Sequence, residues 1–123
     1  METYVRFRMS CEDEAVWLAV AGEIDVASVP QVREALDAGC ATDAPTVVLD
    51  LGAVTFIDSS GIGALIEIHR RLQAQRRQLT ISHLNPSVLK VLQISGAADL
   101  LGVTGSASDP AFSPYRPLGR LVG

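Results

Sequence analysis

The sequence predicts a single α/β domain in which a mixed β-sheet of four to five strands carries helices mainly on one face. The chain has 123 residues, of which 48% are hydrophobic, enough for one core and too few for two. Segments of strand character alternate with segments of helical periodicity, and this order is typical of parallel strands joined by helices. Two strand-like segments at the beginning of the chain add a hairpin, which makes the sheet mixed.

The hairpin is predicted from hydrophobic alternation. Residues 4–9 alternate between polar and apolar side chains, as a half-buried strand does, and the apolar set is Val5, Phe7 and Met9. A polar break at 10–14 separates this strand from the apolar segment Ala15–Ala21, whose alternate residues are in phase. We expect Gly22 to end the second strand.

The first helix and the third strand follow. Ser28 is expected to cap a helix that runs through Ala38, because Pro30 is tolerated in a first turn and Gly39 offers a stop. Thr46–Leu51 is a continuous β-branched run that suits a central strand covered by helices.

Three further elements are predicted downstream. Apolar residues recur at helical spacing from Ser60 to about Gln75, with charged residues mostly on the other side. Leu79–Leu84 forms another short strand, and Asn85–Ser87 begins a helix that Gly96 closes. Residues 1–104 thus form the domain.

Residues 105–123 differ in composition from the rest, with three prolines, three glycines and three serines and little periodicity. We interpret them as a tail that is flexible or draped over the surface. The beginning of the chain lacks the pattern of a signal peptide, and no apolar run is long enough to cross a bilayer, so we expect a cytoplasmic protein.

The charged and sulfur-containing residues exclude several functional classes. The formal net charge is −4, which disfavours binding to nucleic acid. Cys11 and Cys40 form neither a Cys-x-x-Cys motif nor a cluster with histidine, so neither a disulfide scaffold nor a zinc site is indicated. We predict no cofactor and no metal.

The most informative segment joins the predicted third strand to the helix after it. Asp58 is a plausible N-cap, since its carboxylate can accept backbone N–H groups of the first turn. Ser59 then takes the first helical position, where side chains face solvent. Gly61 and Gly63 keep this turn slim, so that another backbone can approach. On local physics alone, the same residues also fit an ordinary capping sequence.

A phosphate on Ser59 would meet the positive end of the helix dipole, and the fold itself should tolerate it. Its charge of about −1.5 to −2 would act on a partner's surface instead. The position therefore suits a switch that controls binding.

The segment Asp58–Gly63 resembles the signature of the STAS family, in particular its bacterial anti-anti-sigma factors. Further segments resemble that family in the same order, and the likeness covers roughly residues 4–104: Gly22–Asp25, Val48–Leu51 followed by Val54–Ile57, Asn85–Val88 and Ser95–Gly96. The residues 26–30 and the tail depart from the family's usual pattern.

This resemblance implies an anti-sigma factor antagonist. Such proteins bind an anti-sigma factor that is also a serine kinase, release the sigma factor, and let go when phosphorylated; a serine phosphatase resets them. The phosphorylated residue maps to Ser59. The implied partner-binding residues are Asp25, Asp58, Ser59, Ser60, Gly61 and Ile62.

Three alternatives remain open. A STAS domain can instead be a scaffold of a stressosome-type complex or an accessory subunit of a transport system; gel filtration separates a large assembly from a monomer or dimer. An enzyme is disfavoured, since Ser59 lacks a Gly-x-Ser-x-Gly elbow and the histidines, His69 and His83, have no indicated orienting group. A nucleic-acid surface would use Arg70, Arg71, Arg76 and Arg77, but a solvated helix face is the favoured explanation for them.

Overall fold

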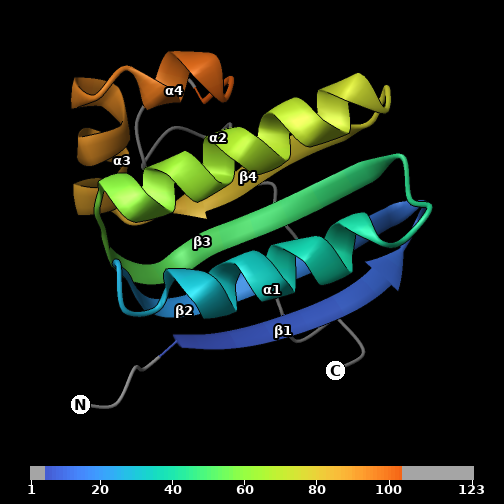
Figure 1. Ribbon diagram of the computed structural model, residues 1–123, viewed down its shortest axis with the longest axis horizontal. Coiled ribbons are helices and arrows are strands. Elements are labelled where there is room, and N and C mark those ends of the chain that lie inside the picture. The colour runs from blue at the N-terminus through green and yellow to red at the C-terminus, as the bar shows by residue number, and fades with distance from the viewer. Residues whose placement is uncertain (1–4, 104–123) are drawn as a thin grey trace.

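The structure, a computed structural model, describes residues 5–103. Figure 1 shows the two-layer α/β arrangement, with a twisted sheet behind a layer of helices. In chain order the elements are β1 (Val5–Glu12), β2 (Ala15–Ile24), α1 (Val29–Cys40), β3 (Thr46–Ile57), α2 (Ser59–Ala74), β4 (Gln78–Leu84), α3 (Pro86–Ile94) and α4 (Ala97–Leu100). The short helix α4 was not expected from the sequence.

Within residues 5–103 the sheet has four strands in the order β1-β2-β3-β4, with β1 and β4 at its edges. β1 pairs antiparallel with β2, whereas β2–β3 and β3–β4 are parallel, which confirms the predicted mixed sheet. Because β2 and β3 are parallel neighbours, their carboxyl ends meet at one end of the sheet. The helices α1 and α2 both begin there, at the left of Figure 1.

The core lies between the sheet and the pair α1 and α2, which run side by side across one face. Two ion pairs tie these helices together on the outside, Arg33 with Glu67 and Arg71 with Asp37. The hydrogen bond to Asp37 raises the pKa of the Arg71 guanidinium. The largest fully buried side chains are apolar and come from both layers, among them Leu18, Ile24, Leu36, Leu49, Leu65 and Leu72.

The hairpin is longer and more exposed than its alternation predicts. β1 continues through the supposed polar break to Glu12, and the turn consists of Asp13 and Glu14, both at positive φ (54° and 63°). Two consecutive positive φ values match the twist of a two-residue hairpin. Phe7 and Met9 remain 37% and 42% exposed, so the prediction of a half-buried strand is wrong for them.

Two predicted strand ends are also wrong. β2 passes Gly22, which adopts φ 116° between two shifts of register, and continues to Ile24. β3 passes Leu51 and ends at Ile57, paired with Ile24. Both strands extend because each provides the other's hydrogen-bond partners, a tertiary effect that local sequence does not contain.

The first helix begins as predicted but is capped differently. Ser28 occupies the N-cap position, yet its side chain makes no capping hydrogen bond. The helix also runs past Gly39 to Cys40, with Gly39 buried inside it. The predicted tail, residues 105–123, lies outside the described residues.

Candidate functional site

The predicted site residues lie where β2 and β3 end side by side. The backbone N–H of Asp58 donates to the carbonyl of Ile24 at 3.1 Å, which fixes the turn after β3 against the last residue of β2. Asp25 follows Ile24 directly, so the two acidic turns adjoin at this end of the sheet. The structure thus brings together residues that lie more than thirty positions apart in the sequence.

The Asp58 cap has the predicted geometry. Its Oδ1 accepts the backbone N–H groups of Ser60 at 2.9 Å and Gly61 at 3.3 Å, and Asp58 has extended backbone angles typical of an N-cap. Ser59 is the first residue of α2 and is exposed. No described residue hydrogen-bonds the hydroxyl of Ser59. The fold therefore presents this oxygen to solvent and makes no use of it.

The turn after β2 is held by its own polar side chains. Asp25 Oδ1 accepts the backbone N–H groups of Ala27 and Ser28, each at 3.0 Å. Ser28 Oγ donates to the carbonyl of Glu23 at 2.7 Å and accepts the backbone N–H of Asp25 at 3.0 Å. Asp25 is half-buried, so its carboxylate both shapes the turn and reaches the surface.

The two glycines at the start of α2 differ in their surroundings. A Cβ on Gly61 would lie 2.5 Å from Cγ2 of Ile24 and 2.7 Å from Cγ1 of Ile57, so the missing side chain makes room for the protein's own core. A Cβ on Gly63 would meet nothing within 4 Å. Ile62 is partly buried and packs against the core, and Ser60 is also half-buried. Of the first four residues of α2, Ser59 is the exposed one.

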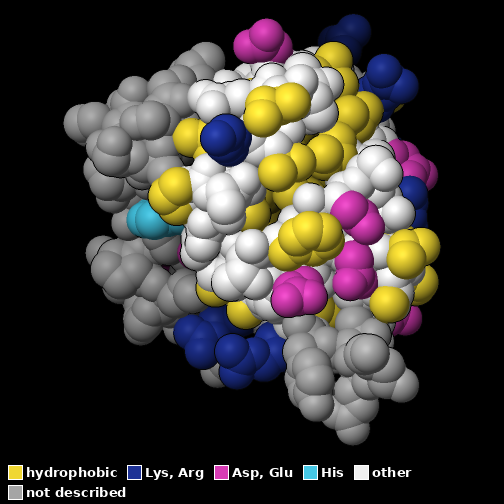
Figure 2. Space-filling view, turned by 90° about the vertical axis from the view of Figure 1, so that its left-hand side faces the viewer, with side chains coloured by type: hydrophobic (Ala, Val, Ile, Leu, Met, Phe, Trp, Pro, Cys, Tyr) yellow, Lys and Arg dark blue, Asp and Glu magenta, His cyan; other side chains and the backbone are white. Residues whose placement is uncertain are grey.

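Two exposed hydrophobic residues at this end were missed by sequence reasoning. Val26, 73% exposed, follows Asp25 in one turn; Phe56, 47% exposed, lies on the last part of β3, where it pairs with Glu23. Figure 2 views this end and shows acidic side chains gathered beside hydrophobic ones. The sequence did hold a signal for them: a large apolar residue stands within two positions of Asp25 and of Asp58. We call Asp25, Val26, Phe56, Asp58 and Ser59 the site surface.

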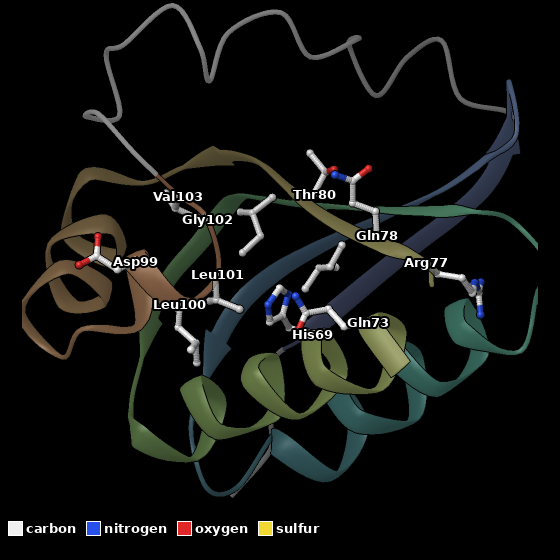
Figure 3. Close-up of a pocket in the computed structure, with 12 residues that line it drawn as sticks. His69, Gln73, Arg77, Gln78, Thr80, Asp99, Leu100, Leu101, Gly102 and Val103 are labelled. Atoms are coloured by element: carbon white, nitrogen blue, oxygen red, sulfur yellow. The ribbon is translucent and has the colours of Figure 1, made fainter. Parts of the chain in front are cut away.

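The cavity in Figure 3 lies elsewhere, between α2, β4 and the segment Asp99–Val103. It has a volume of about 570 Å³, and its described lining contains neither serine nor cysteine. His69 lines it from α2 and is half-buried, ten residues after Ser59 along the same helix. At a rise of about 1.5 Å per residue these two side chains start about 15 Å apart, too far for a nucleophile and its base.

The arginines considered for nucleic-acid binding are partly occupied within the domain. Arg77 donates to the carbonyls of Cys40 and Ala44, each at 2.8 Å, and so binds the end of α1 and the segment after it. Arg71 pairs with Asp37, as described above. Two of the four guanidinium groups therefore hold the protein's own elements together.

Metal-ligating side chains do not gather anywhere in residues 5–103: no group of three or more histidine, cysteine, aspartate or glutamate residues is placed to hold an ion. Within the same residues, no helix has the length and apolarity needed to span a membrane.

Fold and site together define a small α/β domain that presents one exposed serine at the start of a helix, beside two aspartates whose carboxylates accept backbone N–H groups of the adjoining turns. The chain belongs to the STAS family: the STAS domain model matches residues 6–109. The resemblance noted in the sequence is thereby confirmed.

Relatives with known roles are similar over most of the chain. The anti-sigma-B factor antagonist of Listeria monocytogenes is 29% identical over 84 residues, which cover 68% of this chain and 74% of that protein. The anti-sigma factor antagonist SpoIIAA in its unphosphorylated form is 27% identical, with a TM-score of 0.62, over 77% of this chain and 84% of that one. SpoIIAA of Bacillus in the phosphorylated form is 25% identical, with a TM-score of 0.61, over 90% and 100% of the two chains.

Proposed function

We propose that this protein is a cytoplasmic anti-sigma factor antagonist that acts by binding, not by catalysis. Unphosphorylated, it binds an anti-sigma factor with serine kinase activity and so frees a sigma factor. Phosphorylation of Ser59 by that partner ends the complex, and a serine phosphatase restores it. The observation that carries this proposal is the exposed hydroxyl of Ser59 at the first position of α2, which no described residue engages.

The surroundings of Ser59 suit a reversible negative charge. The first turn of a helix has backbone N–H groups without partners in the helix, and its dipole favours an anion. Asp58 occupies only the N–H groups of Ser60 and Gly61. A phosphate on Ser59 would thus stand at the positive end of α2 while the core beneath Gly61 stays unchanged.

The same phosphate would oppose a docked partner for two reasons. Val26 and Phe56 give the site surface exposed apolar area of the kind that interfaces bury. Burying a charge of about −1.5 to −2 beside such a contact carries a large desolvation penalty. Asp25 and Asp58 already make this end acidic, so a partner surface tuned to two carboxylates would meet about twice the charge after phosphorylation.

The relatives support the same role. The Listeria protein is named an anti-sigma-B factor antagonist, and SpoIIAA has been solved both without and with phosphorylation. A protein of this kind works through contact with an anti-sigma factor, which agrees with the wide separation of Ser59 and His69 along α2.

The proposal is tested by using the Ser59→Ala protein as bait and identifying the captured protein by mass spectrometry. We expect an anti-sigma factor that binds Ser59→Ala and wild type with similar affinity. Ser59→Asp should bind at least about 30-fold more weakly, which corresponds to about 2 kcal/mol of binding free energy. Ser60→Ala, at the half-buried neighbouring serine, is the matched control: Ser60 is an implied contact residue but not the switch, so this variant should weaken binding far less than Ser59→Asp does.

The captured partner, purified and supplied with ATP, should add one phosphate to wild type and to Ser60→Ala but none to Ser59→Ala. Tandem mass spectrometry locates the phosphate. A Ser59→Asp protein that keeps full affinity, or a phosphate found on Ser60, would contradict the proposed switch.

A further inference from the structure

The strand β1 is an edge of the sheet with features of a pairing surface. Its eight residues, Val5–Glu12, pair with β2 without a shift of register and include no proline, lysine or glycine. Its other side has no partner among the described strands. Natural edge strands are usually shortened, bulged or charged with lysine to prevent pairing. β1 is neither short nor bulged and has no lysine, although it does carry Arg6, Arg8 and Glu12.

β1 also exposes apolar side chains on the same face of the sheet as the helices. Phe7 is opposite Val20, and Met9 is opposite Leu18, so both share the face on which α1 and α2 pack. Val20 and Leu18 are only 2% and 1% exposed, whereas Phe7 and Met9 are 37% and 42% exposed. The helix layer therefore reaches only part of β1, where Val5 packs against the core, and it leaves Phe7 and Met9 partly exposed.

A second copy of the same strand fits this edge if the two pair antiparallel about a two-fold axis perpendicular to the sheet. Such an axis keeps the two helix layers on one side, and it places residues with an even sum of numbers opposite each other. Opposed residues then lie on the same face. The candidate registers differ only in the residue that lies on the axis.

The charges along β1 exclude two registers. An axis at Arg8 opposes the Arg8 side chains, and an axis at Phe7 opposes Arg6 to Arg8; like charges directly opposite are destabilising. An axis at Met9 opposes Arg6 to Glu12 and Arg8 to Ser10. Because Glu12 already engages another group of its own chain, we count only the separation of the arginines in favour of this register. An axis at Ser10 separates the arginines as well, so the apolar residues must decide between these two registers.

The apolar residues favour the register centred on Met9. An axis at Met9 places Met9 against Met9 and Phe7 against Cys11, so that the exposed apolar side chains cover one another. Moving the axis to Ser10 would set Phe7 against Asp13 in the turn and shorten the paired segment. The register centred on Met9 therefore pairs the whole segment Arg6–Glu12 and opposes no like charges.

We propose that two copies of this protein pair through β1 in antiparallel register centred on Met9, forming one continuous eight-stranded sheet. Main-chain hydrogen bonds supply the pairing, as in other cases of strand addition. Because the partner strand runs in the opposite direction, the carboxyl ends of β2 and β3 lie at opposite ends of the joined sheet. The dimer therefore presents its two Ser59 residues in opposite directions, and each stays open. This inference does not depend on the proposed function.

The first test is the mass of the full-length protein by sedimentation equilibrium across a range of concentrations. Wild type should approach twice its chain mass of 13.1 kDa as concentration rises. Met9→Lys sets two ammonium groups against each other on the axis and should remain monomeric. Ile94→Lys makes the same change in charge at another exposed residue, 77% exposed on α3, and should dimerise like wild type.

The second test reads the register by disulfide trapping. Directly opposed residues of an antiparallel pair lie about 4.5–5.5 Å apart at Cα, within the range of a disulfide. Met9→Cys in a Cys11→Ser background should therefore form a cross-linked dimer under mild oxidation. Phe7→Cys should cross-link through the natural Cys11 of the other copy. It should lose this ability when Cys11→Ser is added, since the two introduced thiols would then start from strand positions about 14 Å apart.

The outcomes divide clearly. A wild-type protein that stays monomeric at all concentrations, or a Met9→Lys variant that still dimerises, overturns the proposal. Cross-linking of Phe7→Cys with Cys11→Ser as efficient as that of Met9→Cys with Cys11→Ser shows a different register and overturns it as well. Circular dichroism of each variant checks that it is folded, and the trapping experiment is independent of the charge introduced in Met9→Lys.

Discussion

Two serines begin helices at the same end of the sheet, and the protein treats them in opposite ways. Ser28 precedes α1 and is fully buried, with its hydroxyl donating to the carbonyl of Glu23 and accepting the N–H of Asp25. Ser59 begins α2 and is exposed, with no described hydrogen-bond partner for its hydroxyl. In both turns an aspartate Oδ1 accepts two backbone N–H groups.

The difference shows what makes a serine available as a switch. A position at the start of a helix is not sufficient, since Ser28 and Ser59 both have such a position. The two turns differ in the side-chain group that holds them. The turn after β2 needs the hydroxyl of Ser28, whereas the turn after β3 needs only the carboxylate of Asp58. A modified Ser28 would lose the turn, whereas a modified Ser59 would change only what a partner meets.

The largest expected effect breaks the turn that needs its serine. Ser28→Ala leaves the carbonyl of Glu23 and the N–H of Asp25 without these hydrogen bonds, and we expect the free energy of unfolding to fall by about 2–3 kcal/mol. Urea denaturation followed by the fluorescence of the single tryptophan, Trp17, measures it. Ser59→Ala is the control and should change stability by less than about 0.5 kcal/mol. Equal losses in the two variants would refute the contrast.

The next effect concerns the packing beneath Ser59. Gly61→Ala forces a Cβ to within 3 Å of Ile24 and Ile57, and overpacking of this kind should lower the free energy of unfolding by about 2 kcal/mol. Gly63→Ala, two residues on, meets open space and should raise it by about 0.5 kcal/mol, because alanine is the better helix former. Urea denaturation of the two variants measures both changes. If Gly61→Ala were as stable as wild type, the core beneath the site would be able to repack around the added methyl group.

The sequence predicted the Ser59 turn well because its structure is local. Asp58 accepts N–H groups two and three residues away, and such a cap is encoded in a few neighbouring residues. The alternation of strands and helices predicted the mixed sheet for the same reason, since hydrophobic periodicity is a local pattern.

The Ser28 turn was predicted less well because its partner comes from β2. The hydroxyl reaches the carbonyl of Glu23, five residues back, and Glu23 is in place only because β2 continues past Gly22 alongside β3. The role of Gly61 has a similar origin: Ile24 and Ile57 meet beside it only once the two strands pair. Where a site residue depends on strand pairing, local sequence did not contain the answer.

A smaller change in stability is expected at Asp58, where two variants distinguish the capping hydrogen bonds of α2 from the negative charge of the capping residue. Asp58→Ala removes the acceptor for Ser60 and Gly61 and should lower the free energy of unfolding by about 1 kcal/mol. Asp58→Asn keeps an acceptor oxygen and should lie within about 0.5 kcal/mol of wild type. Thermal unfolding compares the two variants. If Asp58→Asn were as unstable as Asp58→Ala, the charge at the helix start, and not the cap, would hold this turn.

The smallest expected effect bears most directly on the switch. Ser59→Asp places a carboxylate at the first position of α2, where the helix dipole stabilises an anion by about 0.3–1 kcal/mol, while repulsion from Asp58 works against it. The two effects oppose each other at an exposed residue, so the free energy of unfolding should stay within about 0.5 kcal/mol of wild type. Urea denaturation at low and at high salt should give nearly the same result, because salt screens both contributions alike.

Ser60→Asp, at the half-buried neighbour, is the matched control and should destabilise the domain more than Ser59→Asp does. If Ser59→Asp instead unfolded the domain, loss of binding would follow from loss of structure, and Ser59 would belong with Ser28 as a residue that the fold requires.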